Sequence, residues 1–347
     1  MRPRPYLDAN FKEALVKNAF LKFIAIAAVH VVCITAAQAQ TPPGANRPAA
    51  VPSDYVITPF GYFHPSCVVH LAEGDELRPA QQVIRHADGT TLAVPACNYP
   101  HYRADGEKVY GDERGAYAHA ISHSWIVAAD CVAGSTAIDN MPPCGTTASS
   151  FTALSAQWSV PPAPAANDGQ TLFFFPGLQD ITAAATTILQ PVLGWNADFK
   201  SAWGIASWNC CVSGTVQESQ AQQVSSGDTI HGLIGCHTYL GGACTSWDIT
   251  TSDLQNGKSS QMLDTPSTSP IFNWAFAGAV EVYNIQQCTD FPANGAITFN
   301  NIQLTSNVMV IPNATWAITN YLAGGSTPQC SYGGQAAPLQ ATLTWVP

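Results

Sequence analysis

Short apolar runs alternate with segments rich in Gly, Pro, Ser, Thr and Asn through residues 117–347. The runs are rich in β-branched and aromatic residues, and none carries a sustained apolar repeat of 3.6 residues, so we expect strands rather than helices. Many short strands separated by turns are typical of β-sandwiches and barrels. Strands are predicted within residues 124–129, 154–160, 172–175, 188–193, 229–234, 272–283, 297–304, 308–311 and 339–345. The expected fold is therefore all-β.

The first residues have the pattern of a secretory signal. Basic residues precede an apolar stretch at 23–36, and Ala37-Gln38-Ala39 gives the small-x-small pattern of a cleavage site. We therefore predict a signal peptide over residues 1–39 and a secreted or periplasmic protein. No later segment reaches 18 consecutive apolar residues, the length expected of a membrane-spanning helix, so no membrane anchor is predicted.

Charged residues are unevenly distributed after the predicted signal. Residues 40–116 contain 15 charged side chains, six of them basic, whereas residues 117–347 contain 14, of which only Lys200 and Lys258 are basic. A change of this size near Gly115 indicates a boundary. We interpret residues 40–116 as a leader with a propeptide or accessory module, and residues 117–347 as the β-sandwich domain.

The small number of cations limits the partners that the chain can bind. Without residues 1–39 the chain has 21 acidic and eight basic residues, a net charge of −13. Such a charge disfavours nucleic acid and anionic membranes as partners. When carboxylates are protonated in acid, few positive charges remain to repel one another, so the composition fits an acid-tolerant exported protein.

Ten of the eleven cysteines follow the predicted signal. An even number in an exported chain indicates disulfides, although the spacing does not give the connectivity. Cys236 and Cys244 could close one hairpin, and Cys131 and Cys144 could close a second loop. The chain has no Cys-x-x-Cys sequence, so no structural zinc site is predicted, and no cofactor is expected.

Two glutamates occur after residue 116, and they stand in different surroundings. Glu281 lies in the apolar run 273–284, where burial of an unpaired carboxylate would cost several kcal/mol. Glu281 is therefore either a structural hydrogen-bonding group or a catalyst. Glu218 lies in the glutamine-rich segment 217–223, and we interpret it as part of a solvated face.

Gln190 lies in a second apolar run, 187–195, and a buried glutamine also needs hydrogen-bond partners. If Gln190 and Glu281 face each other on one sheet, their side chains could share a water. Glu281 would activate this water as a general base, and the Gln190 amide would donate a hydrogen bond to the developing oxyanion. A carboxylate base works best in mildly acidic surroundings, which agrees with the charge balance.

The sequence lacks the motifs of several other common catalytic sites. It contains no Gly-x-Ser-x-Gly, no Gly-x-x-x-x-Gly-Lys-Ser/Thr and no His-Glu-x-x-His. His119 and His123 have the spacing of some metal ligands, but no carboxylate accompanies them, so we interpret them as ordinary histidines and predict no metal. Only His231 and His237 follow residue 123, which makes a Ser-His-Asp or Cys-His site hard to assemble.

These residues resemble the motifs of the eqolisin-type glutamic peptidases, acid endopeptidases with a concanavalin-like β-sandwich. Ile188-Leu189-Gln190 matches the Ile-Leu-Gln strand that carries the family's catalytic glutamine. Ala279-Val280-Glu281 approximates the Ala-Glu strand of the catalytic glutamate, with one residue interposed. Further segments that resemble the family follow in the same order over residues 120–305: Ser124-Trp125, Trp158-Ser-Val-Pro161, Phe175-Pro-Gly-Leu178, Ala202-Trp203 and Ser226-Gly-Asp-Thr-Ile230.

The resemblance implies a concanavalin A-like antiparallel β-sandwich that hydrolyses polypeptides as a monomer, without a metal or cofactor. It implies catalysis by Gln190 and Glu281, and substrate binding by Phe175, Trp203 and Trp125. Phe175 replaces the family's cleft tryptophan, and the acidic residue that follows the family's Ala-Trp pair is missing after Trp203. The family's removable N-terminal segment would correspond to residues 40–116, and ion pairs that hold it would weaken as carboxylates are protonated.

Two other functions fit the same fold class. A glycan-binding or glycan-hydrolysing protein is one, because sandwiches of this class also host lectins and glycosidases. A glycosidase would need a second carboxylate about 5–10 Å from Glu281, for which Asp180 and Asp198 are candidates. An exported sandwich without catalytic activity is the other.

Overall fold

The computed structural model describes residues 47–78, 81–94, 97–109, 124–138, 141–181, 187–212, 214–267, 271–307, 309–321 and 328–347. The predicted signal peptide, His119 and His123 lie outside these ranges. Within them, no helix is long and apolar enough to cross a membrane. The helical elements described are two single 3₁₀ turns, η1 (Pro65–Cys67) and η4 (Cys288–Asp290).

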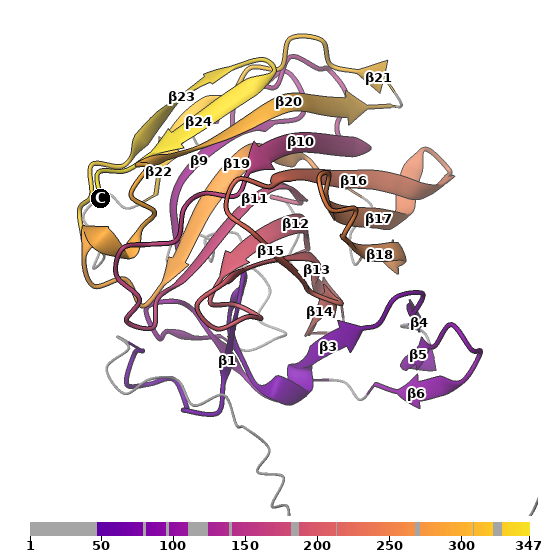
Figure 1. Cartoon of the computed structure of the whole chain (residues 1–347). Coiled ribbons are helices and arrows are strands. Elements are labelled where there is room, and N and C mark those ends of the chain that lie inside the picture. Colours follow the sequence, from indigo (N-terminus) through magenta and orange to yellow (C-terminus); the bar gives the residue numbers. More distant parts are fainter. Residues whose placement is uncertain are drawn as a thin grey trace, which may run out of the picture. The chain divides into compact units, whose positions relative to one another are not determined.

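Two large sheets form an antiparallel β-sandwich, as the sequence predicts. Figure 1 shows them as stacked layers. The nine-stranded sheet has the order β22-β9-β19-β11-β12-β13-β14-β3, with β15 beside β13. Its strands are β3 (Val68–Leu71), β9 (Trp125–Val132), β11 (Thr171–Gln179), β12 (Ile188–Trp195), β13 (Trp203–Val212), β14 (Thr215–Ser219), β15 (Gln222–Val224), β19 (Trp274–Tyr283) and β22 (Ala317–Asn320).

The eight-stranded sheet has the order β18-β17-β16-β10-β20-β24-β23, with β21 beside β20. Its strands are β10 (Ala153–Ser159), β16 (Thr229–Leu240), β17 (Ala243–Asp253), β18 (Ser259–Pro266), β20 (Ala296–Ser306), β21 (Met309–Val310), β23 (Gly333–Ala337) and β24 (Gln340–Thr344). All nine predicted strand segments contain or overlap a strand of these two sheets, which confirms the all-β prediction.

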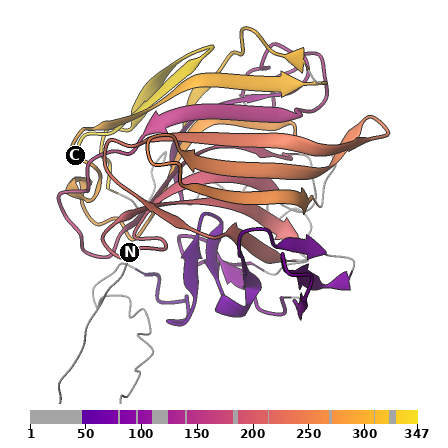
Figure 2. The same cartoon turned by 45° about the vertical axis from the view of Figure 1, so that its right-hand side comes forward.

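Residues 47–109 form two small sheets and contribute one strand to the nine-stranded sheet. The small sheets have the orders β1-β2-β7-β8 and β4-β5-β6. The parallel pairing of β3 with β14 joins this N-terminal segment to the sandwich. Figure 2 shows the segment, coloured indigo to purple, beside the nine-stranded sheet. Its strands are β1 (Val56–Thr58), β2 (Gly61–Phe63), β4 (Glu76–Arg78), β5 (Val83–Arg85), β6 (Thr91–Ala93), β7 (His101–Tyr102) and β8 (Lys108–Val109).

Burial explains why the strands of the two large sheets differ in sequence pattern. In β20, buried and more exposed positions alternate, as expected for a strand with one face toward a core. In β19 and β12 every residue is buried, so both faces of these strands are covered. This is why β19 and β12 appear in the sequence as continuous apolar runs rather than as alternating ones.

The nine-stranded sheet therefore lies between two apolar clusters. One cluster fills the space between the two sheets and includes Phe174 and Trp203 of the nine-stranded sheet and Trp158 and Trp247 of the other. The second cluster lies on the opposite side of the nine-stranded sheet, where residues of the N-terminal segment pack against it. We call this side, which carries Trp125, Phe173, Phe175 and Trp208, the covered face.

All ten cysteines after the predicted signal form disulfides. The pairs Cys131–Cys144 and Cys236–Cys244 confirm the two loop closures predicted from the sequence. The other pairs are Cys67–Cys97 within the N-terminal segment, the adjacent residues Cys210–Cys211, and Cys288–Cys330.

Close packing between the sheets predicts a position-dependent effect of strand glycines. A Cβ atom on Gly278 of β19 would lie 2.2 Å from the Phe299 ring, which belongs to the other sheet. Gly278→Ala is expected to lower the free energy of unfolding by about 1–3 kcal/mol, because the core must move to accept the methyl group. Urea unfolding with the disulfides intact would measure this loss.

Gly235→Ala is the matched control, since a Cβ atom on this β16 glycine meets nothing within 4 Å. It should leave stability unchanged or slightly higher. Equal losses in both variants would contradict tight packing at Gly278.

Candidate functional site

Several buried side chains on the covered face are polar or ionisable, and four of them are considered as candidates for the site. Asp130, Gln190 and Glu281 are fully buried, and Glu218 is 2% exposed. Asp130 lies on β9, Gln190 on β12, Glu218 on β14 and Glu281 on β19. Polar groups of this kind are costly to bury without partners, so the partners of each one bear on what it does.

Glu281 is held by three hydrogen-bond donors. Its Oε1 accepts from Ser124 Oγ at 2.8 Å and from the Tyr283 hydroxyl at 2.7 Å, and its Oε2 accepts from Trp125 Nε1 at 3.2 Å. Burial raises the pKa of Glu281 to about 8, and the three donors offset only part of that effect. Tyr62 of the N-terminal segment packs edge-on against Tyr283, so β2 helps to close this end of the covered face.

Glu218 contacts two ionisable side chains. Its Oε2 lies 2.8 Å from His70 Nδ1 of β3, and its carboxyl group lies next to that of Asp198, in the turn between β12 and β13, and interacts with it. Burial raises the pKa of Glu218 to about 7. Loss of hydration is also the main cause that raises the pKa of Asp198 well above its usual range, and the charge of Glu218 adds to it.

The Asp198–Glu218 contact requires a proton. Asp198 is an exposed residue, whereas Glu218 Oε1 is buried and finds no amide, hydroxyl or ring donor among the described residues. Two ionised carboxylates have only acceptors to offer each other, so the hydrogen bond forms when the two groups share one proton. The prediction that Glu218 lies on a solvated face is therefore wrong.

Gln190 lies beside this carboxyl pair. In the strand register Trp208 of β13 faces Gln190 on one side and Glu218 on the other, so all three side chains point to the covered face at one level. Both Gln190 side-chain polar atoms are buried without a hydrogen-bond partner among the described residues. Gln190 thus presents an unsatisfied donor and an unsatisfied acceptor about two strand spacings, roughly 10 Å, from Glu218.

The register does not bring Gln190 and Glu281 together. Glu281 faces Phe173 of β11, whereas Gln190 stands level with Gly177, one residue before the Leu178–Leu189 pair near the other end of that strand. Four residues along β11 and two strand spacings separate their Cα atoms by about 16 Å. Both side chains share the covered face, as the hypothesis requires, and a water shared between them stays a prediction.

Asp130 is enclosed by hydroxyl groups rather than charges. It accepts hydrogen bonds from Thr319 Oγ1 at 2.9 Å and from the Tyr321 hydroxyl, both close to the edge strand β22. Burial raises the pKa of Asp130 to about 6, and these donors lower it in part.

The predicted substrate-binding aromatic residues are divided between the two clusters. Trp125 and Phe175 pack against each other on the covered face, with ring centroids 5.5 Å apart. Trp203 instead faces the core between the sheets, where it packs against Trp195 and Phe174. Its side chain is 2% exposed, so it does not contribute to the covered face.

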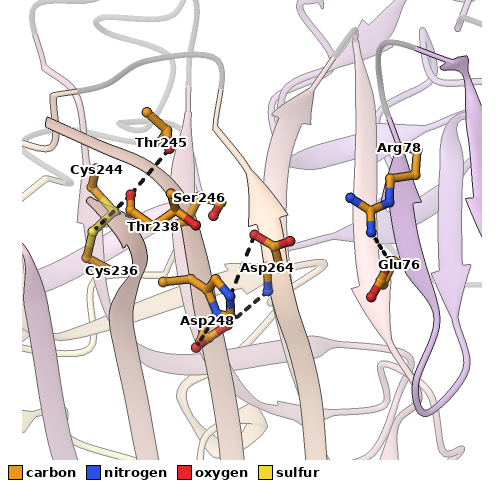
Figure 3. A network of polar contacts seen from close by, with 10 residues as sticks. Glu76, Arg78, Cys236, Thr238, Cys244, Thr245, Ser246, Asp248 and Asp264 are labelled. Carbon is orange, nitrogen blue, oxygen red and sulfur yellow. Dashed lines mark hydrogen bonds and ion pairs between the residues drawn. A yellow bond between two sulfur atoms is a disulfide. The ribbon is translucent and has the colours of Figure 1, made fainter. Parts of the chain in front are cut away.

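A separate polar cluster lies on the eight-stranded sheet. His237 Nδ1 is 2.9 Å from Asp248 Oδ1, and its Nε2 is 4.0 Å from Asp264 Oδ1. Figure 3 shows Asp248 and Asp264 on neighbouring strands, near the Cys236–Cys244 disulfide. The hydrogen bond with Asp248 raises the pKa of His237. Within the described ranges, no group of three or more His, Cys, Asp or Glu side chains is placed to hold a metal ion.

The sequence does not identify Glu218 as a site residue because its neighbours in sequence are polar, and a polar segment is usually exposed to solvent. The segment also lacks the Gly and Pro residues that mark a loop, and this was the available signal for a strand. Asp198 was considered only as a partner for Glu281, whereas the turn between β12 and β13 brings it to Glu218.

No family model and no curated protein matches this sequence. Among solved structures, scytalido-glutamic peptidase with a peptide-based transition-state analogue is 16% identical, with a TM-score of 0.43, over 64% of this chain and 98% of that one. SCP-B, a member of the eqolisin family of peptidases in complex with the tripeptide Ala-Ile-His, is 17% identical, with a TM-score of 0.39 and the same coverage. The CBM2 module of a Lactobacillus casei phage J-1 evolved Dit protein has a TM-score of 0.20 at 11% identity, over 40% of this chain and 64% of that one. These likenesses are distant.

The raised carboxyl pKa values predict that the protein is more stable in acid. Asp130, Glu218 and Glu281 bind protons more tightly when folded, so folding takes up protons. The resulting stability is fully present below pH about 4, the unfolded value, and is lost as pH rises through about 6 to 8. Glu281→Gln should remove part of this dependence and raise the free energy of unfolding relative to wild type by on the order of 3 kcal/mol at pH 8.

Urea midpoints measured from pH 4 to 8 would show this effect, and Glu73→Gln, on an exposed turn, is the control. A wild-type stability that increases from pH 4 to 8 would contradict the raised pKa values.

Proposed function

We propose that this chain is an exported peptidase whose polypeptide substrate binds on the covered face, beside Asp198, Glu218 and Gln190. The observation that carries the proposal is the carboxyl pair. Two carboxyl groups that share one proton supply a base and an acid at the same place, which is what hydrolysis of a peptide bond by an activated water requires.

The pair would act on a water bound between it and the substrate. The ionised oxygen removes a proton from the water as the water oxygen attacks the peptide carbon, and the shared proton passes to the carbonyl oxygen. As the tetrahedral intermediate collapses and the C–N bond breaks, a carboxyl proton goes to the leaving amine, and the ionised carboxylate takes a proton from one of the two hydroxyl groups as the C=O bond re-forms. The pair returns to its singly protonated state.

Gln190 would position the substrate and stabilise the intermediate. Its side-chain amide donates to an oxygen that gains negative charge, which is the role the sequence resemblance implies for it. An amide that has no partner among the described residues is free to take a ligand without breaking an existing hydrogen bond.

The rival assignment keeps Gln190 with Glu281 as the catalytic pair. Strand register places their Cα atoms about 16 Å apart, so the two side chains would have to extend toward each other along the sheet to share a water. The three donors on Glu281 favour a structural role for it in the present arrangement.

A glycan-hydrolysing function is the alternative, and the carboxyl pair disfavours it. Glycosidases hold two carboxyl groups about 5 to 10 Å apart across the sugar bond. Asp198 and Glu218 hydrogen-bond to each other and are therefore too close to flank such a bond.

Access to the site would depend on residues 47–109, because this segment packs on the covered face. We propose that the segment is displaced or removed before a polypeptide binds. Acid favours this step, since protonation of Glu218 removes the charge that faces His70 across 2.8 Å.

Cleavage of an acid-denatured protein by the exported chain, followed from pH 2 to 8, tests the proposal. Activity should rise with pH toward about 7, because the pair supplies a base only after Glu218 has ionised and while Asp198 still holds its proton. Glu218→Gln and Asp198→Asn should each lower kcat by at least about 100-fold. Gln190→Ala should have an effect of similar size on kcat, and Glu281→Gln a smaller one.

Glu73→Gln is the control for charge, and processing of the N-terminal segment should be followed by mass in the same samples. Loss of activity in Glu281→Gln but not in Glu218→Gln would replace the proposed pair with the rival one. No cleavage at any pH by folded protein, with the segment removed, would overturn the peptidase function.

A further inference from the structure

An aromatic side chain of the N-terminal segment, Phe60, packs on the covered face beside Trp208, the residue that lies between Gln190 and Glu218. Phe60 lies at the tip of the hairpin between β1 and β2, half-buried against the covered face. Its ring meets the Trp208 ring edge-on, with centroids 6.3 Å apart. The partner of Trp208 is therefore a residue of the segment that covers the face.

The hairpin that carries Phe60 is built for close approach. Thr58 Oγ1 accepts from the Phe60 backbone N–H at 3.2 Å and donates to the Gly61 carbonyl at 3.0 Å, which fixes the turn. Gly61 has a φ of +122°, and a Cβ atom there would lie 2.3 Å from the Tyr102 carbonyl oxygen. The hairpin thus presents Phe60 in one conformation.

The neighbours of Trp208 are suited to a peptide group. Gln190 offers one buried acceptor and one buried donor without partners in the described chain. A peptide N–H and C=O supply the complementary donor and acceptor, and an aromatic ring stacks edge-on against tryptophan. One ligand class, a peptide containing an aromatic residue, would satisfy all of these groups.

We propose that Trp208 and Gln190 form a subsite for an aromatic residue of a polypeptide, and that Phe60 occupies this subsite in the uncleaved chain. This inference rests on the proposed function for the identity of the ligand as a substrate. The subsite itself can be tested by binding alone. The Phe60 side chain takes the place that the aromatic residue of the ligand would take. Removing this side chain would therefore leave the subsite open.

The binding test uses Phe60→Ala in the full chain, titrated with N-acetylphenylalaninamide and N-acetylleucinamide at pH 5 by calorimetry. The phenylalanine compound should bind at least about tenfold more tightly than the leucine compound, because the vacated space is shaped for a ring. Wild type should bind either compound much more weakly. Val56→Ala, which shortens an exposed side chain on the same hairpin, should behave like wild type.

Two further variants test the residues assigned to the subsite. In the Phe60→Ala background, Trp208→Phe should keep the preference for the aromatic compound, and Gln190→Ala should weaken both compounds. Weak and equal binding of the two compounds by folded Phe60→Ala protein would overturn the proposal.

Cleavage of uncharged peptides that differ only in one Phe or Leu separates this proposal from the peptidase function. A preference of about tenfold or more in kcat/KM for the Phe peptide would support both. Selective binding without cleavage would sustain the subsite and refute the peptidase function. Cleavage without an aromatic preference would support the peptidase function and refute the aromatic subsite.

Discussion

Burial of both faces of the nine-stranded sheet is the constraint on which the rest of this structure depends. One face packs against the second sheet, and the other packs against residues 47–109. A carboxyl group on such a strand has no side open to bulk water, so it is protonated, hydrogen-bonded or paired. The three buried carboxyl groups of the covered face meet this constraint in different ways.

The difference between their partners separates structural roles from functional ones. Glu281 accepts from three donors and Asp130 from two hydroxyl groups, so each has a local hydrogen-bond set that the fold supplies. Glu218 has a histidine from another segment and a carboxyl group as neighbours, and Gln190 has no partner within the described chain. Unsatisfied and like-charged groups that lie at one level of a sheet are costly, which is why the proposed function assigns the reaction to them.

In this arrangement low pH affects both the stability of the sandwich and the contact between the N-terminal segment and the covered face. The carboxyl groups of the covered face bind protons more readily when buried, so acid stabilises the sandwich. Acid also protonates Glu218 and so removes the charge that faces His70 of β3 across 2.8 Å, at one of the contacts between the N-terminal segment and the sandwich. The sandwich would therefore be most stable at low pH, where the contact between His70 and Glu218, which lies over the proposed site, is weakest.

The sequence by itself determined the features that depend on local pattern. Short β-branched and aromatic runs between turn residues were enough to predict an all-β fold, because strand formation follows from side-chain alternation and from turns. The loop disulfides Cys131–Cys144 and Cys236–Cys244 could also be predicted from the sequence, since each closes a short segment. The candidate residues Gln190 and Glu281 were identified because a polar residue in an apolar run is locally conspicuous.

Only the tertiary structure decided which of these groups meet. Strand register sets contacts between residues distant in sequence, and it placed Gln190 level with Trp208 and Glu218 rather than with Glu281. Glu218 looked solvated because its neighbours in sequence are polar, yet the N-terminal segment and the turn carrying Asp198 enclose it. Burial is a property of what packs on a strand from elsewhere in the chain, and a local pattern does not contain that information.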